Sequence, residues 1–202
     1  VGDIFLAKIG KVLTGLNAAF VNVGYPKDGF LHYHDLGPQV NSLNSFIKKL
    51  STGKYKEFTF KNFQYLEDIN KDGSISDVIK SGQNLLVQIV KEPISTKGPR
   101  LSSELSIAGR FLVLVPFSNR VSVSQKIENP EEKERLKRLA KSIKPKGFGV
   151  ILRTVAEGKK VAELDKDLQN SLERWKTMCK RIANTNTPTK ILSELNRASS
   201  IL

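Results

Sequence analysis

The sequence predicts an α+β protein in which a small β-barrel or sandwich precedes a smaller mixed α/β domain with a long C-terminal helix. Three observations predict this class. Short β-rich runs fill residues 3–90, a Pro/Ser/Thr/Gly stretch follows at 92–100, and helical periodicity dominates from residue 130 onward. We therefore expect domains at 1–103 and 104–187, with 188–202 as the start of a truncated subdomain.

The first domain is predicted from four β-rich runs, at 3–13, 18–23, 29–34 and 84–90, which are separated by glycine turns. Short strands with glycine turns are typical of a small barrel or sandwich. The regular spacing is interrupted by a long insert at 37–77, where the alternation of residues 54–61 predicts an extra hairpin strand.

The second domain begins with the apolar run 111–115, which predicts a buried strand. A helix is expected next, because Asn129 can cap it, Pro130 suits its first position, and two acids follow in the first turn. That helix should end at the Pro-Lys-Gly sequence of 145–147, and another strand is predicted over 148–154.

A long helix is predicted from about residue 161 by one apolar stripe. Its members recur at helical spacing: Leu164, Leu168, Leu172, Trp175, Cys179 and Ile182. Trp175 and Cys179 are therefore expected in the core and not in a reactive site.

The charge balance indicates a polyanionic partner. The 202 residues include 33 Lys and Arg against 20 Asp and Glu, which gives a net charge of +13, so nucleic acid or an anionic membrane surface is favoured. The single cysteine excludes an intramolecular disulfide, and no apolar run approaches the roughly 18 to 20 residues of a membrane span. Without a visible signal peptide we expect a cytoplasmic protein, and the start at Val1 predicts a piece of a longer chain.

The most specific pattern lies in the first domain. AAFVNVG at 18–24 is followed by DGFLH at 28–32, DVIKSGQ at 77–83 and VQIVK at 87–91. This series resembles the S1 domain, an oligonucleotide-binding barrel, over essentially all of residues 1–100. Aromatic side chains on adjacent strands offer faces on which bases can stack, and each stacked base contributes about 1–3 kcal/mol to binding. Nearby lysines can follow the phosphate backbone of the nucleic acid. The alternative is that Phe20 and Phe30 are ordinary core residues of the barrel.

A second series of motifs, in the chain after the first, points to one protein family. TKGPRL at 96–101 leads to SIAGRFLVLVP at 106–116, then VSQKI at 123–127 and GVILRT at 149–154. From Asp3 to about Ile182 the chain resembles the ribonuclease E/G family, endoribonucleases in which an S1 domain precedes a small sensor domain for the RNA 5′ end.

The resemblance implies specific binding residues. Phe20, Phe30 and Lys97 fall on positions that contact RNA in the S1 domain. Arg153 and Thr154 fall on the two positions that hold a 5′-monophosphate in the family. Gly109 and Val113 fall on neighbouring positions that line that pocket. A guanidinium and an adjacent hydroxyl suit a phosphate, although a strand-end arginine beside a β-branched residue is also common.

Gln125 departs from the family pattern, because many members carry a second basic residue at its position. The resemblance therefore does not imply an extra phosphate contact there. A small pocket of this kind would accept one phosphate and exclude a triphosphate by crowding. The implied partner is single-stranded RNA, preferably 5′-monophosphorylated, and the full-length protein is expected to form a homo-oligomer.

No catalytic residue or metal site is predicted in this chain. In the family, hydrolysis uses acids that hold Mg²⁺ in a later nuclease domain, and a two-cysteine zinc motif lies beyond it. Cys179 has no partner for such a motif, and Glu194 is the sole acid after Ile182. We therefore expect Mg²⁺ and possible structural Zn²⁺ only in the full-length protein, and no cleavage by this chain alone.

Two further patterns are weaker. Residues 68–75 copy the first half of an EF-hand loop, but Ile79 stands where a bidentate Glu is required, so a polar turn is favoured over calcium binding. His32 and His34 are expected to have surface or groove-lining roles. The main alternative function is a non-catalytic S1 protein associated with ribosomes or translation, whereas membrane binding lacks an amphipathic anchor.

Overall fold

The computed structural model describes residues 1–56 and 58–194, which form two compact units interleaved along the chain. The first unit contains residues 1–56, 64–105 and 178–194, and the second contains the described residues of 57–63 and 106–177. The predicted domains were continuous segments, and their boundaries stay a prediction. Residues 195–202 of the predicted truncated subdomain lie outside the described residues.

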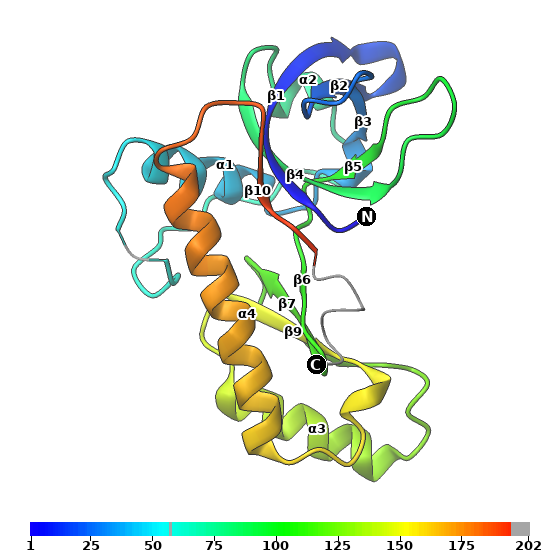
Figure 1. The fold of residues 1–202 in the computed structure, drawn as a ribbon, viewed down its shortest axis with the longest axis vertical. Helices are drawn as coiled ribbons and strands as arrows, with labels where there is room; N and C mark the ends of the chain where they lie inside the picture. The colour runs from blue at the N-terminus through cyan, green and yellow to red at the C-terminus, as the bar shows by residue number, and fades with distance from the viewer. Residues whose placement is uncertain (57, 195–202) are drawn as a thin grey trace. The chain divides into compact units, whose positions relative to one another are not determined.

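The first unit is built on a closed barrel, as predicted. Its strands are β1 (Ile4–Leu13), β2 (Ala18–Asn22), β3 (Gly29–His32), β4 (Asn84–Lys91) and β5 (Arg100–Ser102). They pair in the order β1-β2-β3-β5-β4, and β4 pairs with β1 to close the barrel (Figure 1). Only β3 and β5 are parallel in this closed ring. This strand order is that of an OB-like fold.

The barrel interior is filled by apolar side chains that alternate with outward-facing residues. In β2, Ala19 and Val21 are buried while Phe20 between them is 37% exposed. In β3, Leu31 is buried while Phe30 and His32 on either side are half-buried. Because successive side chains of a strand point to opposite faces, Phe20 and Phe30 lie outside the barrel core.

The insert contains a helix where no helix was predicted. Helix α1 (Val40–Ser51) buries Val40, Leu43, Phe46, Ile47 and Leu50 at helical spacing, and a short helix α2 (Ile75–Val78) follows. The predicted hairpin strand at 54–61 is wrong for its described residues, because 54–56 are irregular and 58–61 form bends and a turn, while residue 57 lies outside the described part. Phe60 of that segment serves the second unit instead, where it is 1% exposed, whereas the Tyr55 ring stays in the first unit with its centroid 5.5 Å from that of Phe46.

The second unit is a four-stranded mixed sheet with the predicted helices. The strands β6 (Ile107–Ala108), β7 (Leu112–Pro116), β8 (Val121–Val123) and β9 (Phe148–Leu152) lie in the order β6-β7-β9-β8. Helix α3 (Pro130–Ile143) begins as predicted, because Asn129 Oδ1 accepts the N–H of Glu131 at 2.9 Å. Helix α4 (Val161–Ile182) runs beside the sheet in Figure 1.

The core of the second unit is an aromatic cluster. The Phe60 ring centroid lies 4.5 Å from that of Phe117, 4.8 Å from that of Phe148 and 5.9 Å from that of Trp175. Trp175 is 1% exposed and donates its indole N–H to the Phe58 carbonyl at 2.8 Å, which satisfies its polar group. Trp175 and Cys179 are thus buried core residues, as predicted.

One further strand returns to the barrel from the end of α4. Strand β10 (Thr189–Leu192) pairs antiparallel with β1 and extends the barrel sheet. It covers the edge of β1 beside Ile4, Phe5 and Leu6. Within residues 1–56 and 58–194, every helix is too short or too polar to cross a bilayer.

Candidate nucleic-acid interface

Two aromatic rings lie next to each other on the outer face of the barrel. Phe20 of β2 and Phe30 of β3 are direct partners in the antiparallel register, and their ring centroids are 6.1 Å apart in an edge-to-face arrangement. The strands present both rings outward because the small or apolar residues beside them fill the barrel interior. Exposed ring faces of this kind can stack on nucleic-acid bases.

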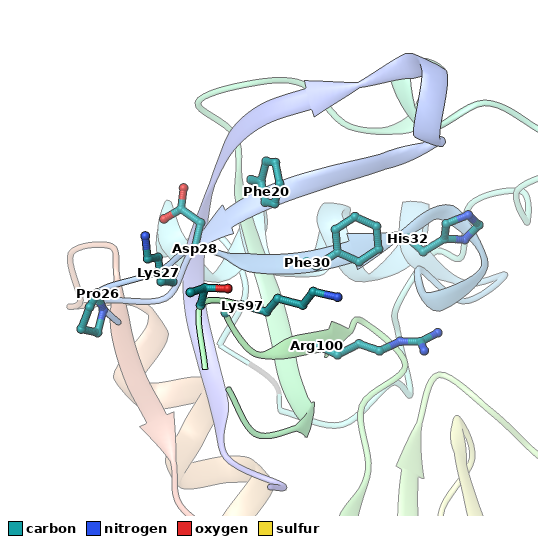
Figure 2. A pocket seen from close by; sticks show the side chains of 10 residues that line it. Phe20, Pro26, Lys27, Asp28, Phe30, His32, Lys97 and Arg100 are labelled. Carbon is teal, nitrogen blue, oxygen red and sulfur yellow. The ribbon is translucent and has the colours of Figure 1, made fainter. Parts of the chain in front are cut away.

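These rings form one wall of a groove of about 910 Å³. Figure 2 shows Phe30 and His32 in a row along β3, with Phe20 on the neighbouring strand and Lys97 and Arg100 opposite. The structure therefore brings together all three residues of the predicted RNA-binding set. The lining residues are Phe20, Pro26, Lys27, Asp28, Phe30, His32, Thr96, Lys97, Gly98 and Arg100.

Lys97 reaches the groove because the loop before β5 is fixed against β3. The Phe30 N–H donates to the Pro99 carbonyl at 2.9 Å, and the backbones of Ile94 and Lys97 bond to each other. Gly98 permits this approach, since a Cβ there would lie 2.0 Å from the carbonyl oxygen of Asp28. A larger residue at position 98 would clash with the backbone of Lys27 and Asp28 and force the loop that carries Lys97 to shift.

The groove is electropositive. Lys27, Lys97 and Arg100 line it, against the one acid Asp28 among its lining residues. Arg100 also donates to the Asp35 carboxylate from Nη2 at 3.1 Å, which fixes its guanidinium. A groove that combines aromatic faces with lysine and arginine suits a single-stranded polyanion. Lys27 and Arg100 were not predicted, because only the tertiary fold places Arg100 opposite Phe30 and Lys27 in the lining of the same groove.

In the second unit, a hydrogen bond joins Arg153 to Gly109, two residues of the predicted phosphate pocket. Arg153 follows β9, and its Nη1 donates to the Gly109 carbonyl at 2.7 Å. Its backbone N–H donates to the Phe111 carbonyl at 2.8 Å. Arg153 is exposed, and a guanidinium has five donors, so the remaining ones can serve a ligand.

Thr154 is placed beside a second hydroxyl. Its Oγ1 lies 2.9 Å from Oγ of Ser124, which follows β8. The parallel pairing of β8 with β9 produces this contact, since the Ser124 N–H donates to the Leu152 carbonyl at 2.8 Å. The exposed Gln125 follows directly. Ser124 is thus part of the candidate site, although it was not among the predicted site residues.

The loop that carries Gly109 is held by a buried carboxylate. Asp167 of α4 accepts three backbone N–H groups, from Arg110 at 2.9 Å, Phe111 at 2.8 Å and Leu112 at 3.1 Å. Gly109 lies so close that a Cβ on it would be 2.6 Å from Asp167 Oδ2. Val113, half-buried in β7, pairs with Ala108 and Ile151 on either side. Asp167 therefore fixes the loop that orients Arg153.

Two further cations lie at the Phe111 ring of the same loop. The guanidinium carbon of Arg110 lies 5.2 Å from the Phe111 ring centroid, and Nζ of Lys159 lies 5.4 Å from it. Both are within cation–π range. With Arg153 and the Ser124–Thr154 hydroxyl pair, they make this edge of the second unit a region suited to an anion.

An ion pair on α3 braces the turn that follows Thr154. Arg135 donates to Glu132 from Nε and Nη2, each at 2.7 Å, and its Nη1 donates to the Lys159 carbonyl at 2.9 Å. Glu132 Oε1 also accepts the Gly158 N–H at 2.7 Å. The hydrogen bonds from Arg135, followed by that from Gly158, lower the pKa of Glu132 from 4.5 to about 2.

This brace predicts a pH dependence of stability. The folded pKa of Glu132 is depressed, so its contribution is fully present above about pH 4.5 and is lost as the pH falls toward about 2. Glu132→Gln should lower the melting temperature at neutral pH, and the difference from wild type should shrink below about pH 4.5 and disappear as the pH falls through about 2. Thermal unfolding across this range measures it, with the exposed neighbour variant Glu131→Gln as control; a constant difference at every pH would contradict the assignment.

The EF-hand-like segment is a polar turn, as predicted. The Asp72 N–H donates to Asn70 Oδ1 at 3.1 Å, and the Gly73 N–H donates to the Asn70 carbonyl at 3.2 Å. Among residues 1–56 and 58–194, no group of three or more His, Cys, Asp or Glu is arranged to hold a metal ion.

Comparison with known proteins shows which family this chain is similar to. The family model described as the ribonuclease E/G family matches residues 106–202. The chain is 34% identical to ribonuclease G of Escherichia coli (strain K12) over 202 residues, which cover 100% of this chain and 37% of that protein. It is also 34% identical to ribonuclease E of a Nostoc species over 189 residues, which cover 93% of this chain and 24% of that protein. The chain thus spans well under half the length of these relatives.

Proposed function

The chain belongs to the ribonuclease E/G family, and from this premise we propose that it is the RNA-binding portion of an endoribonuclease that processes and degrades single-stranded RNA. The aromatic groove carries the proposal. Phe20 and Phe30 offer neighbouring exposed rings on an OB-like barrel, and Lys97, Lys27 and Arg100 supply positive charge beside them. In this role the first unit acts as an S1-type RNA-binding domain.

The second unit is proposed to sense the 5′ end of the RNA. A 5′-monophosphate would take charge-assisted hydrogen bonds from Arg153 and a directional bond from the Thr154 hydroxyl. The contact of Arg153 with the Gly109 carbonyl already fixes the guanidinium in one orientation. Arg110 and Lys159 add positive charge at the same loop, which favours a phosphate further.

Hydrolysis belongs to the full-length protein in this proposal. The acids that hold Mg²⁺ and the cysteines that hold a structural Zn²⁺ would lie in its nuclease and zinc-binding parts, and this chain alone would be inactive. The full-length protein is proposed to be a cytoplasmic homo-oligomer. This chain would then grip RNA and inspect its 5′ end while cleavage takes place elsewhere in the protein.

The 5′-end preference is tested with two short unstructured RNAs that differ only in a 5′-monophosphate or a 5′-hydroxyl. Fluorescence anisotropy at fixed salt should show roughly tenfold tighter binding of the phosphorylated RNA, because hydrogen bonds to a charged group contribute about 1.5–3 kcal/mol. Arg153→Ala should abolish the preference. Arg138→Ala removes the same charge from an exposed position of α3 and should keep it; equal binding of both RNAs by the wild type would exclude the 5′ sensor.

A further inference from the structure

A second cavity lies in the first unit next to the aromatic groove. Its volume is about 430 Å³, and its lining includes Tyr33, His34, Pro38, Ile69, Lys71 and Glu104. His32 lines the groove and His34 lines the cavity, and their ring centroids are 4.9 Å apart. The His34 N–H also donates to His32 Nδ1 at 3.1 Å. The two neighbouring imidazoles therefore lie between the groove and the cavity, one lining each.

The walls of the cavity are fixed by hydrogen bonds between distant segments. The hydroxyl of the buried Tyr33 donates to the Asn70 carbonyl, and the Ile69 N–H donates to the Pro38 carbonyl at 3.0 Å. Asn17 ties down the same segment, since its Nδ2 donates to the Gly73 carbonyl at 3.1 Å. A cavity with walls of this kind is formed before a ligand arrives.

Glu104 is held against the cavity by a glycine. Gly37 has a φ of +79°, and a Cβ at this position would lie 2.4 Å from Cγ of Glu104. The Glu104 N–H donates to Ser102 Oγ at 3.1 Å, which anchors the residue at the end of β5. The side chain of Glu104 therefore packs across Gly37 and brings the one carboxylate among the lining residues to the cavity.

This lining suits a flat ring with hydrogen-bond donors on its edge. Pro38 and Ile69 offer apolar surface and His34 an aromatic ring, while Lys71 can attract a neighbouring phosphate. A carboxylate accepts hydrogen bonds and donates none. Guanine presents two adjacent donors, N1–H and its amino group, that match two carboxylate oxygens. Uracil presents one donor flanked by two carbonyl oxygens, which a carboxylate repels.

We propose that this cavity is a second base-binding subsite that selects guanine in the nucleotide next to the one stacked on Phe20 and Phe30. The inference rests on the proposed function, because it requires RNA in the aromatic groove. RNA would run from the two phenylalanines across His32 and His34 into the cavity, where Glu104 reads the base edge. Binding to single-stranded RNA would then depend on sequence as well as on charge.

The test compares a ten-nucleotide oligouridylate with the same oligomer carrying one central guanosine, both with a 5′-hydroxyl. The wild type should bind the guanosine-containing RNA about tenfold more tightly, as expected for hydrogen bonds to a charged acceptor. Glu104→Gln should reduce that preference to about twofold or less, because the amide replaces one acceptor oxygen with a donor. Asp68→Asn removes a negative charge from an exposed position of the insert and should preserve the preference.

Phe30→Ala separates failure of this inference from failure of the proposed function. This variant should weaken the binding of both RNA oligomers by a similar factor and leave the ratio of the two affinities unchanged. Equal affinities of the wild type for the two oligomers, with both lowered by Phe30→Ala, would overturn the guanine subsite alone. A preference that persists in Glu104→Gln would also overturn it. Affinities insensitive to Phe30→Ala would overturn the RNA groove itself.

Discussion

Replacing both Phe20 and Phe30 with alanine is expected to weaken binding of single-stranded RNA by about 30-fold or more. Loss of base stacking costs about 1–3 kcal/mol for each base, and 1.4 kcal/mol corresponds to a factor of ten. The rings are direct partners across β2 and β3 with centroids 6.1 Å apart, so one strand of RNA can use both. Each single variant, Phe20→Ala or Phe30→Ala, should bind single-stranded RNA roughly fivefold to tenfold more weakly than the wild type.

The fold should survive this double substitution. Phe20 is 37% exposed and Phe30 is half-buried, whereas the interior of the barrel is filled by residues such as Val21 and Leu31. The main loss is the edge-to-face contact, worth about 0.5–1.5 kcal/mol. Thermal unfolding and RNA titration of the same samples separate the two effects.

Leu16→Ala is the matched control for the aromatic pair. Leu16 lies in the short 3₁₀ helix Thr14–Leu16 of the same unit, is 60% exposed, and does not line the groove. It removes apolar surface without removing a ring from the groove, so its RNA affinity should match the wild type. Unchanged affinity in the double phenylalanine variant would rule out stacking on this face as the basis of binding.

Asp167→Ala is expected to destabilise the second unit by about 3–5 kcal/mol and to abolish any preference for a 5′-phosphate. The carboxylate accepts the N–H groups of Arg110, Phe111 and Leu112 and is 9% exposed. Each buried donor left without an acceptor costs about 1–3 kcal/mol. The freed loop also carries the Gly109 carbonyl that orients Arg153.

Asp165→Ala is the matched control on the same helix. Asp165 accepts one bond from the Gln169 side chain at 3.3 Å on the exposed side of α4, so its loss should change stability by no more than about 0.5 kcal/mol. Chemical denaturation measures both variants. Asp167→Asn keeps one acceptor oxygen and should be intermediate; wild-type stability in Asp167→Ala would show that the loop does not depend on this carboxylate.

The local signals of the sequence identified much of the fold. The Asn129–Pro130 start placed α3, because side-chain capping and a fixed proline φ act within one helical turn. The apolar stripe that includes Trp175 and Cys179 identified α4 and its buried face. Helix α1 was not predicted although its apolar residues recur at regular helical spacing. The insert is rich in polar residues, and the alternating aromatics at 54–61, just after the helix, suggested a strand instead.

The candidate sites were predictable only in part. Phe20, Phe30 and Lys97 were named from their motifs, and the fold gathers them at one groove. Arg100 joins them because β5 lies parallel to β3 in the closed barrel, with Phe30 opposite Arg100. Asp167 could not be identified, because the backbone groups that it binds lie 55 to 57 residues earlier in the chain.

By itself, the sequence determined the positive charge, the strand and helix signals, and the family motifs, since each depends on composition or on residues within a few turns of one another. Tertiary structure alone decided that residues 58–63 complete the second unit, that β10 returns to β1, and that Glu104 packs over Gly37 beside a cavity. These features depend on contacts between distant segments, because burial and strand pairing are settled when the chain closes on itself and not by local preference.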